Sequence, residues 1–282
     1  MSMGLNSEAE HLLAGRWIAG ERISDAIRVA KRLNDDGIAA IINYLGERHT
    51  DEKKVMSTVK EYSKLISSIE KSFVKADIAL KPTEIGLAID EGEFVRNYTV
   101  ITRLALKHKV FVWLDMEESE FVDSTMRAYM IAVKKRNVGI CIQSYLKRSE
   151  GDLEELLSHK AIVRLVKGAY RPKGREFYSS SGTDRNYVKL MRILFERGDR
   201  FTIASHDARV VEAARRLNGR YRRDVTYAML EGMRMDYAER LAGDGEKVSI
   251  YVPYGKEWAA YSYRRLRELG SLKLVARSLL GG

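Results

Sequence analysis

Two adjacent arginines near the end of the chain could bind a small carboxylate. Arg264 and Arg265 follow Tyr261 by about one helical turn in the segment YVPYGKEWAAYSYRRLREL, residues 251–269. A guanidinium group can bind a carboxylate through two parallel N–H···O hydrogen bonds. The same pair could instead lie on a solvated helix face, so the choice depends on what else reaches this part of the fold.

Other polar side chains follow apolar, β-branched segments at regular intervals. They are Glu47, Lys81, Asp115 with Glu117, Gln143, Arg164 with Lys167 and Tyr170, His206 with Asp207, and Tyr251 with Tyr254. Taken singly, Glu117 or Asp207 is more often a helix N-cap or a solvated loop residue than a functional group. A barrel held together only by packing would not need so many polar residues at strand ends, so the set indicates a functional site.

The segments that must position these side chains alternate along the chain. We predict strands at residues 38–45, 76–82, 110–116, 138–146, 161–170, 200–207, 224–230 and 247–254. Segments with the apolar period of a helix separate them, for example 121–136 and 212–219, and a helix over 21–37 precedes the first strand. Continuous apolar strands suit a parallel sheet that is buried on both faces. The pattern predicts a distorted (β/α)8 TIM barrel with a short N-terminal helix; an open doubly wound sheet is disfavoured because no GxGxxG motif is present.

Composition limits the class of protein. The 282 residues, 45% of them hydrophobic, can form one barrel domain over 1–282, with a short helical arm at 1–34. No apolar run is long enough to span a membrane, and the N-terminus lacks the pattern of a secretory signal. The single cysteine excludes an internal disulfide and suggests a reducing compartment, and five scattered histidines make a metal site unlikely. These features predict a cytoplasmic protein.

The net charge of +10 is spread along the chain among acidic residues. No segment interleaves basic and aromatic residues as nucleic-acid-binding segments do, so we expect no nucleic-acid partner. A weak attraction to an anionic membrane surface, such as the inner face of the cell membrane, is more compatible with this distribution.

Several chemistries can be weighed from the residue types. Two lysines expected to be buried, Lys81 and Lys167, could form a Schiff base, but a nearby carboxylate such as Asp115 would favour the charged amine. The basic excess fits a glycosidase poorly, and metal-assisted hydrolysis would need more than His206. A cofactor enzyme remains, in which Arg164 and Lys167 face an anionic ring system and a pyrophosphate, and Gly168 allows close approach of the backbone.

The motifs resemble those of the proline dehydrogenases, flavin-dependent barrels found alone in some prokaryotes and within the bifunctional proline utilization A enzymes. VRLVKGAY (163–170) is similar to the fifth-strand motif of that family, and YVPYGKEWAAYSYRRLRE (251–268) to its eighth-strand and eighth-helix signature. Further similar segments are LKPTEIGL (80–87), WLDMEE (113–118), IQSYL (142–146) and AMLEGMR (228–234). The resemblance spans residues 35–268.

The resemblance implies a role for each matching position. Lys81, Arg264 and Arg265 would bind the proline carboxylate, and Asp115 would hydrogen-bond beside Lys81 and order the site. The substrate ring would lie against Tyr251, Tyr261, Leu230 and Tyr170. Arg164 would approach the flavin N5, and the FAD contacts would be Met116, Gln143, Arg164, Lys167, Gly168, Ala169, Ser205 and His206. Glu47 would pair with the first clamp arginine, Arg264, and close the site. The catalytic set would be Arg164, Asp115, Lys81 and Tyr251.

The resemblance also implies a reaction and its partners. L-proline would lose a hydride from C5 to N5 of FAD, forming Δ1-pyrroline-5-carboxylate in the first step of proline catabolism. Electrons would pass to a quinone-type acceptor, and a separate pyrroline-5-carboxylate dehydrogenase would oxidise the product, since no aldehyde dehydrogenase domain follows. Oxidation of hydroxyproline or another cyclic imino acid, and a non-catalytic basic barrel that binds an anionic partner, are the alternatives.

Overall fold

A closed barrel of parallel strands forms the centre of the molecule. The computed structural model describes residues 17–170, 175–259 and 261–262. Within them, strands β1 to β8 pair in chain order, and β8 pairs with β1. The strands are β1 Ala39–Tyr44, β2 Ala76–Leu80, β3 Val112–Leu114, β4 Val138–Gln143, β5 Ile162–Val166, β6 Arg200–Ala204, β7 Asp224–Leu230 and β8 Lys247–Tyr254. Each lies within a predicted segment, so the TIM-barrel prediction is confirmed.

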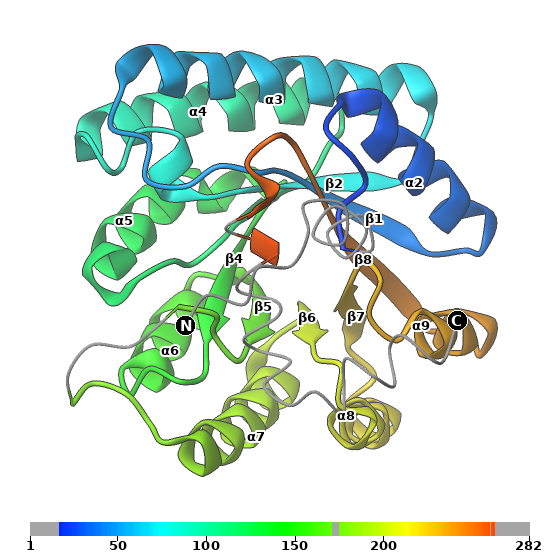
Figure 1. Ribbon diagram of the computed structural model, residues 1–282. Helices are drawn as coiled ribbons and strands as arrows, with labels where there is room; N and C mark the ends of the chain where they lie inside the picture. The colour runs from blue at the N-terminus through cyan, green and yellow to red at the C-terminus, as the bar shows by residue number, and fades with distance from the viewer. Residues whose placement is uncertain (1–16, 171–174, 260, 263–282) are drawn as a thin grey trace, which may run out of the picture.

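A ring of helices surrounds the strands (Figure 1). The helices are α2 Ile23–Asp35, α3 Glu52–Ser72, α4 Glu91–Lys107, α5 Val122–Ala132, α6 Ser149–Ser158, α7 Ser180–Arg197, α8 Ala208–Tyr221 and α9 Met235–Gly243, with 3-10 turns at Pro82–Glu84, Ser119–Phe121 and Val133–Lys135. The predicted helix over 21–37 is α2, which packs against β1 and β8. The predicted segment 121–136 divides into one 3-10 turn, α5 and a second 3-10 turn.

Short polar side chains fix where several helices begin. The carboxylates of Asp51 and Asp90 accept hydrogen bonds from backbone N–H groups in the first turns of α3 and α4. Asp207 does the same for α8, where it accepts from Arg209 N at 2.9 Å. Each cap satisfies a helix N–H group that would otherwise lack a partner. Asp207 therefore has the N-cap role that its type suggested.

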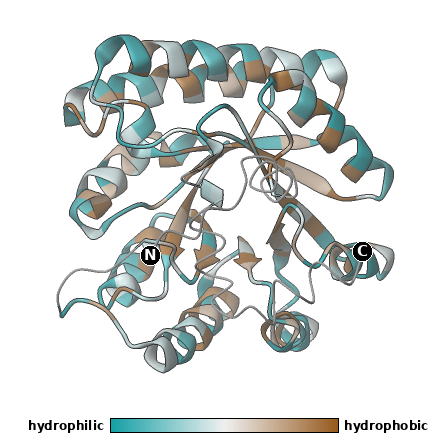
Figure 2. Ribbon diagram, in the orientation of Figure 1, coloured by the Kyte–Doolittle hydropathy of each residue, from teal (hydrophilic) through white to brown (hydrophobic). Residues whose placement is uncertain are grey.

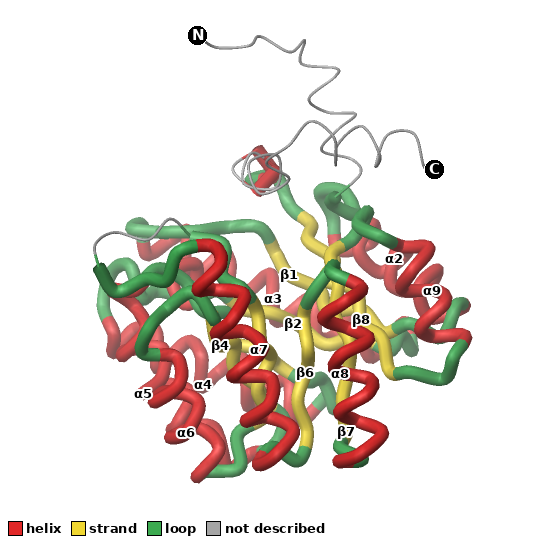
Figure 3. Tube along the Cα trace, turned by 90° about the horizontal axis from the view of Figure 1, so that it is seen from below, coloured by secondary structure: helices red, strands yellow, loops and turns green. Residues whose placement is uncertain are grey.

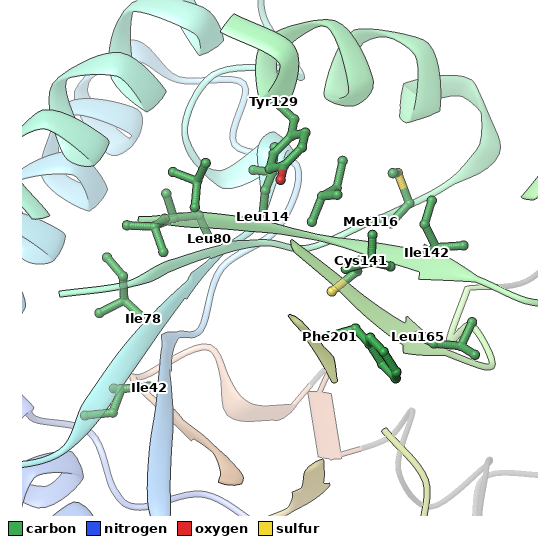
Figure 4. Close-up of a cluster of buried hydrophobic side chains, with 14 of the residues drawn as sticks. Ile42, Ile78, Leu80, Leu114, Met116, Tyr129, Cys141, Ile142, Leu165 and Phe201 are labelled. Atoms are coloured by element: carbon green, nitrogen blue, oxygen red, sulfur yellow. The ribbon is translucent and has the colours of Figure 1, made fainter. Parts of the chain in front are cut away.

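Two apolar layers hold the barrel together. The larger lies between the strands and the helices. In Figure 2 hydrophobic residues (brown) are frequent in the strands, and the surrounding helices carry both hydrophobic and hydrophilic residues. The smaller fills the barrel interior with Ile41, Ala79, Phe111, Trp113 and Ile162. Successive strand residues point to opposite faces, and Figure 4 shows the neighbours Cys141 and Ile142 on opposite sides of β4.

The parallel arrangement determines where polar strand ends can meet. All strand pairs are parallel, and Figure 3 shows the strands between the surrounding helices. The carboxyl ends of the strands therefore lie at one end of the barrel. The arginine pair Arg264–Arg265 lies outside the described residues. None of the helices in the described segments is both long and apolar enough to cross a membrane.

Candidate active site

A cavity of about 600 Å³ opens at the carboxyl ends of the strands. Every strand, or the loop that follows it, contributes to its wall, from Ile41 of β1 to Tyr251 of β8. This volume is within the range of sites that bind small molecules or part of a cofactor. The cavity is therefore the candidate active site.

The structure brings most of the predicted site residues to this cavity. The predicted residues that line it are Lys81, Asp115, Met116, Gln143, Arg164, Lys167, Gly168, Ala169, Tyr170, Ser205, His206, Leu230, Tyr251 and Tyr261. Glu47 lies beside the cavity rather than on its lining, and Arg264 and Arg265 are outside the described residues. The barrel geometry thus places together residues that are up to 180 positions apart in the sequence.

Arg164 is the central charge of the cavity wall. Its Nη2 donates to Asp115 Oδ1, and its Nε donates to Cys141 Sγ at 3.0 Å. The guanidinium carbon lies 4.9 Å from the centre of the Trp113 ring and 5.5 Å from that of Tyr251. Only 4% of Arg164 is exposed, so these contacts fix a positive charge away from water.

Asp115 connects this arginine to the opposite side of the barrel. Besides Arg164, its carboxylate accepts from the Tyr251 hydroxyl at 2.7 Å and from Cys141 Sγ at 3.4 Å. The prediction placed Asp115 in a hydrogen bond beside Lys81, whereas the Lys81 ammonium donates to Glu47 Oε1 at 2.7 Å. Asp115 therefore orders Arg164 and Tyr251, and Glu47 is the carboxylate bonded to Lys81.

Burial and these neighbours change the acidity of the cluster. Burial raises the pKa of Tyr251 well above its usual value, and Asp115 raises it further. Burial raises the pKa of the Cys141 thiol to about 12. For Arg164, burial opposes the charged form, but Cys141 and Asp115 outweigh it and the pKa is raised. The cluster thus holds a charged guanidinium beside a neutral phenol and a neutral thiol over the neutral pH range.

The ends of β5 and β6 form the other wall. His206 Nε2 accepts from the Leu230 backbone N–H at 3.0 Å, so in the neutral ring Nδ1 carries the proton. Lys167 pairs with Asp184 at 2.6 Å, and 48% of its side chain is exposed. The expectation that Lys167 is buried was therefore wrong, because it lies beyond the last residue of β5.

The site chemistry fits an anionic aromatic cofactor such as FAD. Arg164 Nη1 is buried and has no hydrogen-bond partner among the described residues. A buried donor of this kind is normally satisfied, so an acceptor atom on a ligand in the cavity would complete it. Lys167 and the backbone at Gly168 and Ala169 lie at the rim, where phosphate groups could be bound.

Close packing of the protein itself also requires a glycine at position 168. Its φ of +113° lies in the region that favours glycine, and a Cβ there would lie 1.5 Å from the Tyr145 ring. Tyr145 in turn stacks on Phe177, with ring centres 5.4 Å apart. The glycine is thus required by close packing against Tyr145, whatever ligand lies on its other side.

We expect Gly168→Ala to lower the free energy of unfolding by at least about 2 kcal/mol, since it combines backbone strain with overpacking. Bound FAD per chain should also fall. Chemical denaturation and the flavin absorbance after gel filtration measure the two effects. Gly151→Ala is the control, because Gly151 lies in α6 with no atom within 4 Å of the added Cβ. A Gly168→Ala protein as stable as the control would contradict this account.

Three residues have positions that sequence reasoning did not identify. Cys141 contacts both Arg164 and Asp115, although it was noted only as the single cysteine. Glu117 is neither an N-cap nor solvated: it is fully buried, and burial raises the pKa of Glu117 to about 7. Tyr254 points away from the cavity towards α3, where its hydroxyl lies 3.4 Å from Glu61. The parity of β8 could have indicated this, since Tyr251 and Tyr254 are an odd number of residues apart.

Comparisons with known proteins agree with this geometry. The family model described as proline dehydrogenase matches residues 26–273, somewhat more than the 35–268 expected from the motifs. The chain belongs to the proline dehydrogenase family. It is 32% identical over 260 residues to proline dehydrogenase 1 of Bacillus subtilis subsp. natto, covering 90% of this chain and 86% of the relative. It is 33% identical over 266 residues to a proline dehydrogenase of Deinococcus radiodurans, covering 91% and 86%.

The fold agrees with a larger member of this group. Proline utilization A from Bdellovibrio bacteriovorus, solved after inactivation by N-propargylglycine, superposes with a TM-score of 0.87 at 23% identity. The match covers 95% of this chain and 34% of that protein. Membership of the proline dehydrogenase family makes the chain an enzyme and excludes the non-catalytic basic barrel.

Proposed function

We propose that this chain oxidises L-proline to Δ1-pyrroline-5-carboxylate with FAD, in the first step of proline catabolism. The observation that supports this most strongly is the convergence of the predicted proline and flavin contacts on one cavity around Arg164. Bound FAD would supply the acceptor for the hydride that leaves C5, and a quinone-type molecule would remove the two electrons. The ring nitrogen of proline loses its proton, which leaves the C=N bond of the product.

The residues of the chain bind and orient the substrate. Lys81 supplies a buried positive charge for the proline carboxylate, with the predicted clamp arginines Arg264 and Arg265. Tyr251 and Leu230 form the wall for the ring, together with Tyr261 and Tyr170. Because hydride transfer needs the unprotonated amine, the rate should rise with pH over the alkaline range.

A dye-reduction assay of FAD-loaded protein tests the choice of substrate. L-proline, hydroxyproline and pipecolate should be compared at matched concentrations. We expect the highest kcat/KM for L-proline, since Tyr251 and Leu230 limit the space around the ring. A higher kcat/KM for hydroxyproline or pipecolate would favour the alternative imino-acid substrate. With L-proline as the substrate, a separate pyrroline-5-carboxylate dehydrogenase would oxidise the product.

We further propose that the chain contacts an anionic membrane surface. The segments that lead into β2, β3, β4 and β5 (71–75, 106–111, 134–137 and 157–161) carry basic side chains and no Asp or Glu. The basic residues are Lys71, Lys75, Lys107, Lys109, Lys134, Lys135, Arg136 and Lys160. Within the described residues neither these lysines nor this arginine pair with a carboxylate, whereas His108 in segment 106–111 lies 2.6 Å from Glu70, and Phe73 is 95% exposed. An exposed aromatic residue amid unpaired basic side chains suits the surface of an anionic bilayer.

This basic surface lies at the end of the barrel opposite the cavity, because helix-to-strand connections meet the amino ends of the strands. Of the corresponding segments before β1, β6, β7 and β8, three (34–38, 196–199 and 242–246) contain more acidic than basic residues, whereas 220–223 contains three arginines and no Asp or Glu. Contact through the basic surface would leave the cavity open to proline. Because the basic surface and the cavity lie at opposite ends of the barrel, lipid binding and quinone reduction should be measured in separate experiments.

We expect the protein to co-float with vesicles that contain phosphatidylglycerol and to stay unbound with phosphatidylcholine alone. Replacing Lys107, Lys109 and Lys134 with glutamine should weaken binding roughly 100-fold, at about 1 kcal/mol for each charge. The matched control replaces Lys31, Lys53 and Lys60, which are exposed on α2 and α3 away from these segments. Equal losses in both triple variants would count against a specific surface and indicate a general charge effect.

A further inference from the structure

Glu117 is a fully buried carboxylate next to the cavity whose role the proposed reaction leaves open. It follows β3, and both of its oxygens bind the residue that follows Lys81 by two positions. Thr83 N donates to Oε2 at 2.8 Å, and the Thr83 hydroxyl donates to Oε1 at 2.8 Å. A carboxylate with two short hydrogen bonds in a buried position holds its partner more firmly than a solvated one would.

The same residue is bonded to two further strand ends. The Gln143 side chain, at the end of β4, donates to the Glu117 backbone carbonyl at 2.8 Å. The Tyr170 hydroxyl, beyond β5, lies 3.4 Å from Glu117 Oε1. Glu117 thus connects the loop after β2 with two cavity-lining residues, one at the end of β4 and one after β5.

Thr83 extends these bonds to the loop that carries Glu47. Its hydroxyl accepts from Arg48 N at 2.9 Å, and its carbonyl accepts from His49 N at 3.1 Å. Glu47 directly precedes Arg48, and Lys81 lies just before Thr83. Glu47 therefore adjoins backbone that is hydrogen-bonded to Thr83, and Lys81 is joined to Thr83 through Pro82, so both members of the 2.7 Å Lys81–Glu47 ion pair lie next to a residue that is bonded to Glu117.

We propose that Glu117 is a positioning residue at the mouth of the cavity, which holds the Lys81–Glu47 pair through Thr83 and holds Tyr170 directly. This role rests on the proposed binding of the proline carboxylate by Lys81. Glu117 does not line the cavity, so it acts on the substrate only through these neighbours. Loss of Glu117 should affect substrate binding more than the chemical step, because Arg164 is held by a different carboxylate, Asp115.

Three variants and one control test the proposal. Glu117→Ala removes the carboxylate, Thr83→Val removes the hydroxyl at nearly constant size, and Thr83→Ser restores it. We expect the first two to raise KM for proline roughly 10- to 100-fold, the range expected when a binding group is misplaced by about 1 Å. The value of kcat and the bound FAD per chain should change much less, and Thr83→Ser should return KM close to that of the wild type.

Thr102→Val is the matched control, since Thr102 is equally buried and its hydroxyl is bonded to Thr99 O within α4, away from the cavity. It should lose stability as Thr83→Val does, without a change in KM. A rise in KM for this control equal to that of Thr83→Val, or an unchanged KM in Glu117→Ala, would overturn the positioning role and leave Glu117 a purely stabilising residue.

Hydrogen exchange gives a second measurement that does not depend on proline. The amides of Arg48 and His49 should exchange faster in Glu117→Ala and Thr83→Val than in Thr102→Val. Unchanged exchange at both amides would contradict the proposed connection. If these amides exchange faster in the two variants but the wild-type protein does not oxidise proline, the proposed function would be contradicted and the connection would remain intact.

Discussion

Asp115→Ala is expected to reduce kcat/KM for proline at least about 100-fold and to lower the free energy of unfolding by roughly 3 kcal/mol. Arg164, which is 4% exposed in the wild type, would keep its charge, and among the described residues Cys141 would be its remaining side-chain acceptor. Removing one member of a buried ion pair typically costs about 3–5 kcal/mol. The Tyr251 hydroxyl loses its 2.7 Å acceptor as well, so both the charge and the wall of the cavity would shift.

A double-mutant cycle separates this pair from a general loss of packing. Asp115→Asn keeps the size and can still accept from Tyr251, so it should lose less stability than Asp115→Ala. Combining Asp115→Ala with Arg164→Met should restore part of the stability, because the unpaired buried charge is then absent. Chemical denaturation measures the cycle. Strictly additive losses would show that Asp115 and Arg164 are not coupled.

Lys81→Met should raise KM for proline about 10- to 150-fold, because it removes a charge-assisted hydrogen bond worth roughly 1.5–3 kcal/mol. The side chain is only 7% exposed, and methionine is of similar length, so the barrel should stay folded. Pyrrolidine, which has no carboxylate, should be oxidised by the variant nearly as well as by the wild type. Steady-state kinetics on both substrates measure the difference.

Lys81→Arg is the matched control for charge. It keeps the positive group but changes its shape, so its KM for proline should lie between those of the wild type and Lys81→Met. Equal losses on proline and pyrrolidine in Lys81→Met would mean that the lysine supports the fold or the flavin rather than the carboxylate. The same comparison applies to Arg264→Ala and Arg265→Ala, whose positions lie outside the described residues.

The barrel could be predicted because its strands are buried on both faces. Segments such as 138–146 are largely continuous apolar runs. They alternate with segments of helical period, and only a few chain topologies are compatible with that alternation. Once the barrel is assumed, the carboxyl ends of all strands must share one mouth. The convergence of Lys81, Arg164 and Tyr251 then follows from topology without knowledge of any side-chain contact.

The partners of these residues could not be predicted in the same way. Strand order makes β2 and β3 neighbours, which suggested Lys81 beside Asp115, but side-chain direction and loop path decide the pairing. The loop after β1 brings Glu47 within 2.7 Å of Lys81, while Asp115 points to Arg164 two strands away. Glu117 illustrates the same limit. Its buried carboxylate accepts two hydrogen bonds from Thr83, and the preference of single residue types for helix N-caps contains no information about such a contact.

Anaerobic titration of the FAD-loaded protein with L-proline tests the central claim most directly. We predict that stoichiometric proline bleaches the visible absorbance of the flavin, that pyrroline-5-carboxylate appears in equal amount, and that a soluble quinone restores the oxidised spectrum. Flavin that binds at the cavity but stays oxidised in excess proline, while another cyclic imino acid reduces it, would contradict the account.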